Sequence, residues 1–97
     1  MAMKNPPHPG LHVKDEIDAL EIPVGKAAVA LGITRSQLHR IISGQSGISA
    51  EMALRLETVL GGSADLWLRL QSAFDVAQAR KRANEIVGGL ARLSMPA

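Results

Sequence analysis

Short amphipathic segments, each bounded by capping residues, constrain the fold of this chain more than any other feature. Apolar residues recur at helical spacing, and glycine, proline or a hydroxyl residue stands at most of the boundaries. The expected helices are about 10–20, 23–31, 34–43, 49–60 and 63–82. No stretch alternates apolar and polar residues as a strand does. The sequence therefore predicts an all-α fold of five helices.

Composition bounds the organisation of the chain. Its 97 residues suffice for one domain. Residues 1–9 carry three prolines and are expected to form a flexible arm, residues 10–82 the folded domain, and residues 83–97 a partly helical tail. No apolar run reaches the roughly 18 residues of a membrane span. The absence of cysteine suits a reducing compartment. We therefore expect a cytoplasmic protein.

The join between the second and third segments carries the strongest motif. Ala28, Gly32, Ile33, Leu38 and Ile41 stand at the offsets that a helix-turn-helix requires. A small residue at position 28 lets the two helices cross closely, and glycine at position 32 permits the tight turn between them. The three remaining apolar residues anchor the second helix of the pair to the core. The opposite face of that helix is therefore predicted to point outward.

The outward face and its flank are polar, and residues 26–45 contain no acid. A helix of this size fits the major groove of B-form DNA, where arginine pairs with guanine and glutamine with adenine, and basic groups hold phosphates. The alternative is an ordinary solvated helix face. The motif and the charge distribution favour DNA. The predicted DNA-binding residues are Lys26, Thr34, Arg35, Ser36, Gln37, His39, Arg40 and Ser43.

Other signals favour no catalytic or metal chemistry. The three histidines, His8, His12 and His39, do not combine with further ligands at a metal-binding spacing. No pairing of a nucleophile with a base, no paired carboxylates and no glycine-rich phosphate loop is visible. We therefore expect no enzyme activity and no cofactor.

The chain resembles the HigA/VapI antitoxin branch of the lambda-repressor/Cro-like (XRE) superfamily over about residues 8–80. The motifs that carry the resemblance are His8-Pro9-Gly10, LGITRS at 31–36, IISG at 41–44, GISA at 47–50, ALRL at 53–56, LWLRLQ at 66–71, FD at 74–75 and AQAR at 77–80. The last three are similar to the most specific signature of that branch. Departures occur at Leu11, Val24, Gly25 and Leu66; Gly25 lacks the phosphate-binding glutamine side chain usual there.

The resemblance implies a five-helix lambda-repressor-like domain that represses its own operon as a homodimer on palindromic double-stranded operator DNA. It also implies neutralisation of a HigB-type mRNA-cleaving toxin. Asp15, Glu16 and Asp18 are the expected toxin-binding residues. Two alternatives stay open: a stand-alone repressor without a toxin, and a helical protein-interaction module that no longer binds DNA. The expected dimer contacts are Leu68, Ala73, Val76, Ala77 and Arg80.

Overall fold

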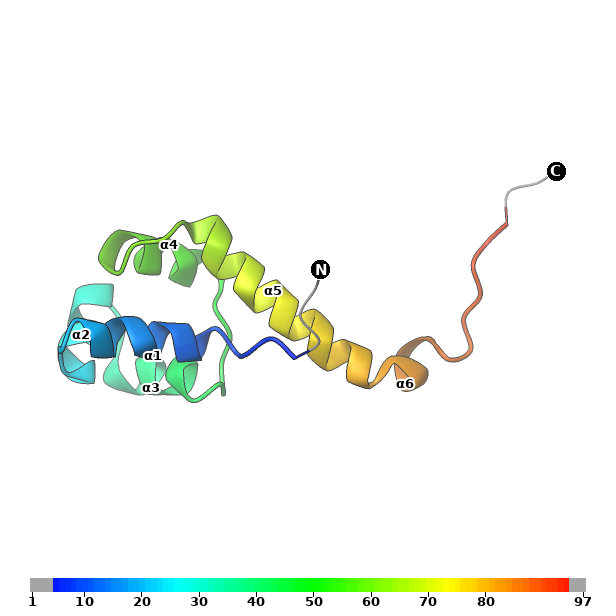
Figure 1. Cartoon of the computed structure of the whole chain (residues 1–97), viewed down its shortest axis with the longest axis horizontal. Helices are drawn as coiled ribbons and strands as arrows, with labels where there is room; N and C mark the ends of the chain where they lie inside the picture. The colour runs from blue at the N-terminus through cyan, green and yellow to red at the C-terminus, as the bar shows by residue number, and fades with distance from the viewer. Residues whose placement is uncertain (1–4, 95–97) are drawn as a thin grey trace.

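Six helices and their connections make up the computed structural model, which describes residues 5–94 (Figure 1). Among these residues there is no strand, and five of the helices have at least eight residues. The all-α prediction is confirmed. The helices are α1 (Gly10–Ala19), α2 (Val24–Leu31), α3 (Arg35–Ile42), α4 (Ala50–Val59), α5 (Ala64–Lys81) and the short α6 (Ala83–Val87). Residues 1–4 of the expected arm and 95–97 of the tail lie outside the described residues.

The core lies where α1 to α4 meet the first turns of α5. In this core α3 packs on α1 and α2, and α4 packs on α2 and α5. The first helix was predicted to reach residue 20, where Leu20 has the helical spacing of an inner residue, but Leu20 is 54% exposed. The helix ends at Ala19, so the chain turns away before Leu20 can face the core. The buried side chains are Val13, Ile17, Ala27, Ala28, Leu31, Leu38, Ile41, Ile48, Met52, Ala53, Leu56 and Trp67.

The segment just before α1 belongs to the folded body, which corrects the expectation of an arm up to residue 9. Pro9 is fully buried. The half-buried His8 packs its ring edge-on against Phe74 of α5, with the ring centroids 4.8 Å apart, and its Nδ1 accepts a hydrogen bond of 2.9 Å from the backbone N–H of Gly10. Two aromatic rings from distant parts of the chain thereby connect the N-terminal segment to α5.

Capping groups fix the joint between α4 and α5. Ser63 accepts a hydrogen bond from the N–H of Leu66, which caps α5. The indole of Trp67 donates to the carbonyl oxygen of Gly61 at 3.0 Å, and Glu57 accepts from the N–H of Ala64 at 2.6 Å. The bonds to Ser63 and Glu57 satisfy backbone donors that the start of α5 leaves free, and the indole bond connects α5 to the loop after α4.

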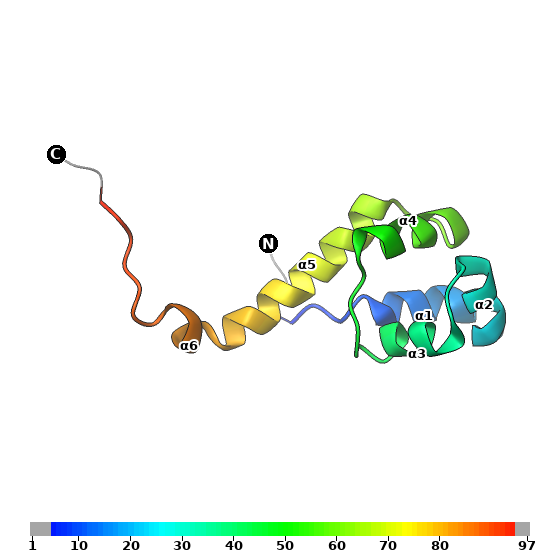
Figure 2. The same ribbon diagram turned by 180° about the vertical axis from the view of Figure 1, so that it is seen from behind.

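The second half of α5 projects beyond the body, and α6 and the following residues extend further (Figures 1 and 2). The molecule measures 61 × 24 × 24 Å and has a radius of gyration of 17.0 Å. A compact chain of this length has a radius of about 12–13 Å. Within residues 5–94, no helix is both long enough and apolar enough to cross a bilayer.

Candidate nucleic-acid interface

The turn between α2 and α3 depends on two small residues. Ala28 is buried, and its carbonyl oxygen accepts a hydrogen bond of 3.1 Å from the N–H of Ile33. Gly32 has the left-handed conformation, with φ of 71° and ψ of 29°. A side chain at this position would be strained by that conformation and would also lie against the guanidinium of Arg55. The turn therefore has the geometry that the sequence motif predicted.

Arg55 of α4 holds the same turn from outside the motif. Its Nη1 donates to the carbonyl oxygen of Leu31 at 2.9 Å and to that of Gly32 at 3.3 Å. Its Nη2 pairs with Glu51 at 3.1 Å. The last carbonyls of α2 lack partners within their own helix, so the guanidinium satisfies groups that would otherwise bind water. Arg55 is a positioning residue for the helix-turn-helix.

A reciprocal capping box starts α3. The N–H of Gln37 donates to Thr34 Oγ1 at 3.0 Å, and the N–H of Thr34 donates to Gln37 Oε1 at 2.8 Å. A threonine followed three residues later by glutamine is the sequence pattern of such a box, yet the Gln37 amide is also a predicted contact to adenine. Oε1 has two lone pairs. It can therefore accept a hydrogen bond from a base while it keeps the one from the backbone N–H of Thr34.

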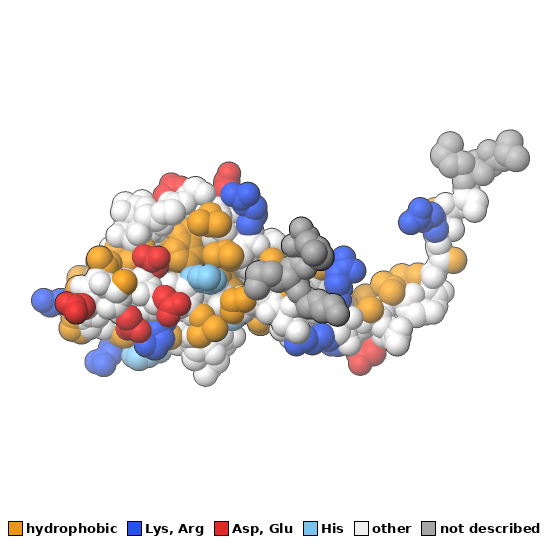
Figure 3. All heavy atoms as spheres, in the orientation of Figure 1, with side chains coloured by type: hydrophobic (Ala, Val, Ile, Leu, Met, Phe, Trp, Pro, Cys, Tyr) orange, Lys and Arg blue, Asp and Glu red, His pale blue; other side chains and the backbone are white. Residues whose placement is uncertain are grey.

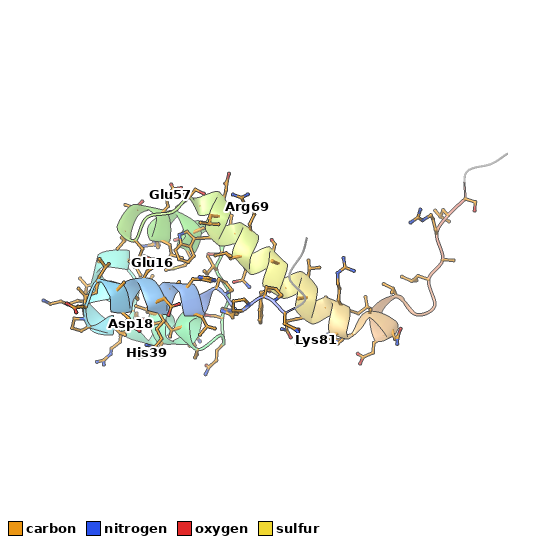
Figure 4. The ribbon with its side chains drawn as sticks, in the orientation of Figure 1. Glu16, Asp18, His39, Glu57, Arg69 and Lys81 are labelled. Atoms are coloured by element: carbon orange, nitrogen blue, oxygen red, sulfur yellow. The ribbon has the colours of Figure 1, made fainter. Side chains whose placement is uncertain are left out.

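The outer face of α3 is open to solvent. Leu38 and Ile41 are buried and attach the helix to the core. His39 lies on α3 at the lower rim of the body in Figure 4. The Ser43 hydroxyl donates to the carbonyl oxygen of Arg40 at 3.2 Å, so it also serves the end of the helix. All the predicted DNA-binding residues are exposed: Lys26, Thr34, Arg35, Ser36, Gln37, His39, Arg40 and Ser43.

Gln71 positions the loop that follows α3. Its Oε1 accepts a hydrogen bond of 2.7 Å from the N–H of Ile48, and its Nε2 donates to Asp75 at 2.9 Å. The side chain lies against Gly47, where an added Cβ would be 3.1 Å from the amide group. The sequence did not predict that Arg55 would hold the turn after α2 or that Gln71 would hold the loop after α3. Their polar side chains beside the apolar stripes of α4 and α5 were the available signal.

The remaining predicted residues lie on two other surfaces. Asp15, Glu16 and Asp18 are exposed on α1, where acidic side chains gather on the face seen in Figure 3. Asp18 is paired with Lys14 at 2.8 Å. On α5, Ala73, Val76 and Arg80 are exposed and Ala77 is half-buried. Leu68 differs from these because it packs against the core of its own chain.

The fold and the open face of α3 define a DNA-binding regulator with a helix-turn-helix, a class without enzymatic activity. Residues 14–67 match the helix-turn-helix family, and the chain belongs to this family, in its XRE-type branch. It is 48% identical to virulence-associated protein A′ of Dichelobacter nodosus over 77 residues, which are 78% of this chain and 67% of that protein.

Solved structures of antitoxins are similar to this chain over nearly their whole length. Antitoxin GraA in complex with its operator is 34% identical, with a TM-score of 0.84, over 98% of this chain and 97% of GraA. Pseudomonas aeruginosa antitoxin HigA with the higBA promoter is 33% identical, with a TM-score of 0.84, over 93% of this chain and all of HigA. The resemblance to HigA-type antitoxins predicted from the sequence is thereby confirmed.

Proposed function

We propose that this protein is a sequence-specific antitoxin that represses its own toxin–antitoxin operon and neutralises a HigB-type mRNA-cleaving toxin. The observation that carries the proposal is the exposed polar face of α3, which is fixed to the core by Leu38 and Ile41. The similarity to GraA with its operator and to HigA with its promoter supports the same conclusion.

The outer face of α3 enters the major groove of the operator in this proposal. Arg35 and Arg40 bind guanine edges or phosphates, since the guanidinium donates two parallel hydrogen bonds. Lys26 on α2 neutralises a backbone phosphate. One such helix makes few contacts, so the protein acts as a homodimer whose two α3 helices read half-sites about one turn of DNA apart. Ala73, Val76, Ala77 and Arg80 on α5 supply the dimer contacts, with Leu68 beside them.

The toxin contact in the proposal is the acidic side of α1. Glu16 and Asp15 offer carboxylates that a basic ribonuclease surface can pair with, and Asp18 can exchange Lys14 for a toxin cation. These acids lie on α1 and the predicted DNA-binding residues on α2 and around α3, so the two proposed contacts use different elements.

A titration of labelled DNA from upstream of the gene tests the DNA contact. We expect Arg40→Ala to weaken binding by about 1–3 kcal/mol if Arg40 reads a base. Arg69→Ala is the matched control, because Arg69 lies on α5 at the opposite rim of the body from His39 (Figure 4). Unchanged affinity after removal of both Arg35 and Arg40 contradicts the assignment.

Co-expression tests the toxin partner. A neighbouring reading frame of about a hundred codons should be toxic alone and harmless together with this chain. Asp15→Asn combined with Glu16→Gln should weaken the rescue while leaving operator binding intact. If no neighbouring frame is toxic, the protein is a stand-alone repressor.

A further inference from the structure

An apolar groove lies between the N-terminal segment, α1 and α5. Its volume is about 840 Å³. Pro6, Pro7, Leu70, Ala73 and Ala77 give it mainly apolar walls, and Arg80 and Lys81 line it as well. The arrangement of His8 against Phe74 keeps the N-terminal wall in place beside α5. Such mainly apolar walls suit an apolar peptide segment.

The same chain carries an apolar segment with nothing to pack against. Ile86 and Val87 are about half exposed, Leu90 is 74% exposed and Leu93 is 93% exposed. In both views the residues after α6 lead away from the body (Figures 1 and 2). The orange side chains of Figure 3 continue along this extension. An apolar segment exposed to this degree is typical of an interaction site.

We infer that the groove beside α5 receives the tail segment 86–93 of a second copy of this chain. This inference rests on the homodimer of the proposed function and assigns the elements that complete it. In a two-fold dimer each contact occurs twice, so each copy gives its tail and receives its partner's tail. The groove and the tail adjoin the same helix, so the exchange extends the proposed α5 contact. Both apolar surfaces are thereby covered without any further partner.

Cysteine crosslinking tests the exchange, because the chain has no natural cysteine. One variant carries Ala77→Cys in the groove, and a second, with a larger affinity tag, carries Leu90→Cys in the tail. We mix the two and oxidise them mildly. A disulfide needs Cβ atoms only about 4 Å apart, so a covalent species with one chain of each size is expected to accumulate.

Val29→Cys in place of Leu90→Cys is the matched control. Val29 is 80% exposed on α2 and does not line the groove, so this pair reports random collisions. The inference is overturned if the groove–tail pair links no faster than the control pair. It is equally overturned if a chain with both Ala77→Cys and Leu90→Cys forms mainly an intrachain link, since its own tail then fills the groove.

Operator titration separates this inference from the proposed function. If the wild-type chain binds its upstream DNA as two copies and the crosslink fails, the exchange is wrong and the operator function stands. If the crosslink forms and no upstream DNA binds, the exchange stands and the operator function is wrong. As a second measurement, Val87→Asp with Leu90→Asp should shift the monomer–dimer equilibrium in sedimentation toward monomer. An unchanged equilibrium again counts against the exchange.

Discussion

His8 contributes to the fold through a ring contact and an acceptor nitrogen. Its imidazole packs on Phe74, and its Nδ1 accepts the N–H of Gly10 at the start of α1. Burial lowers the pKa of His8 below its ordinary value, and the nearby carboxylate of Asp75 offsets this only in part. Because Nδ1 accepts a hydrogen bond, the neutral ring carries its proton on Nε2. A second proton must therefore bind Nδ1, which breaks that hydrogen bond and places a charge on a half-buried ring. The neutral imidazole is therefore the form that the folded state prefers.

The free energy of unfolding should consequently depend on pH through His8. Because the pKa is lowered in the folded state, the unfolded chain binds the proton more readily. The contribution of neutral His8 to the free energy of unfolding is fully present above about pH 6.5. It is lost as the pH falls from there through the lowered pKa of the folded state. His8→Asn keeps an acceptor but cannot titrate. Urea unfolding at several pH values should show a smaller loss toward acid in this variant, and equal losses would contradict the role of His8.

Arg55 acts on the helix-turn-helix through the backbone of its turn. We expect Arg55→Met to lower the free energy of unfolding by about 1.5 kcal/mol, because two carbonyl oxygens at the end of α2 lose a charged donor. Glu51→Gln is the control; it removes only the exposed ion pair, which contributes about 0–1 kcal/mol. Urea unfolding measures both. Equal losses in the two variants would show that the ion pair, and not the turn, is what Arg55 serves.

At the scale of the element, one side chain of α3 has an observed structural role and a proposed role in recognition. Gln37 closes the capping box with Thr34 and also lies on the exposed face. Gln37→Glu separates the two demands. Glutamate caps as well as glutamine, so stability should change by less than about 0.5 kcal/mol. Its carboxylate has no amide donor for adenine and repels phosphate, so operator affinity should fall by about 1–3 kcal/mol.

Thr34→Ala is the complementary control for Gln37→Glu. It removes a cap without adding charge and should lower the free energy of unfolding by about 1 kcal/mol. Thermal unfolding and operator anisotropy, measured on both variants, give two independent readouts. If Gln37→Glu destabilises the protein as much as Thr34→Ala does, the Gln37 side chain serves the cap alone.

The sequence predicts α3 well because its signals are local. The capping box, Gly32 and the buried pair Leu38 and Ile41 each follow from spacing within a few residues. Arg55 and Gln71 act across more than twenty residues of chain, and no local pattern encodes such contacts. The same reason explains why the packing of His8 on Phe74 was missed.

Local sequence signals do not predict where a helix ends or what covers its apolar face, as α1 and α5 show. Leu20 has the helical spacing of an inner residue, yet α1 ends one residue before it. On α5 the pattern continues beyond the body, and Val76 is left 49% exposed. Spacing identifies an apolar face without identifying what covers it. For the second half of α5, that covering surface lies on another molecule in our inference.

At the scale of the whole molecule, the net charge is small, and the basic side chains that could bind DNA are concentrated near α3. The net charge is only +2, so overall attraction to DNA is weak, and the contacts near α3 must supply the electrostatic affinity. The acids of residues 15–21 lie on and just after α1, and residues 26–45, which include α3, contain no acid. Because the net charge is low, the salt dependence of operator binding should report individual side chains.

Lys26→Ala should lower that salt dependence. Each neutralised phosphate contributes about 0.9 to the slope of log K against log salt, so a dimer that loses two such contacts should lose about 2. Lys26 lies on α2, which crosses the DNA backbone in the proposed complex, so affinity should fall to a similar extent on operator and unrelated DNA. Arg69→Ala, on the opposite rim of the body, should leave the slope unchanged (Figure 4). Anisotropy titrations at several salt concentrations measure both slopes. A loss near 1 would mean that only one Lys26 of the dimer binds a phosphate, and equal slopes in the two variants would remove Lys26 from the interface.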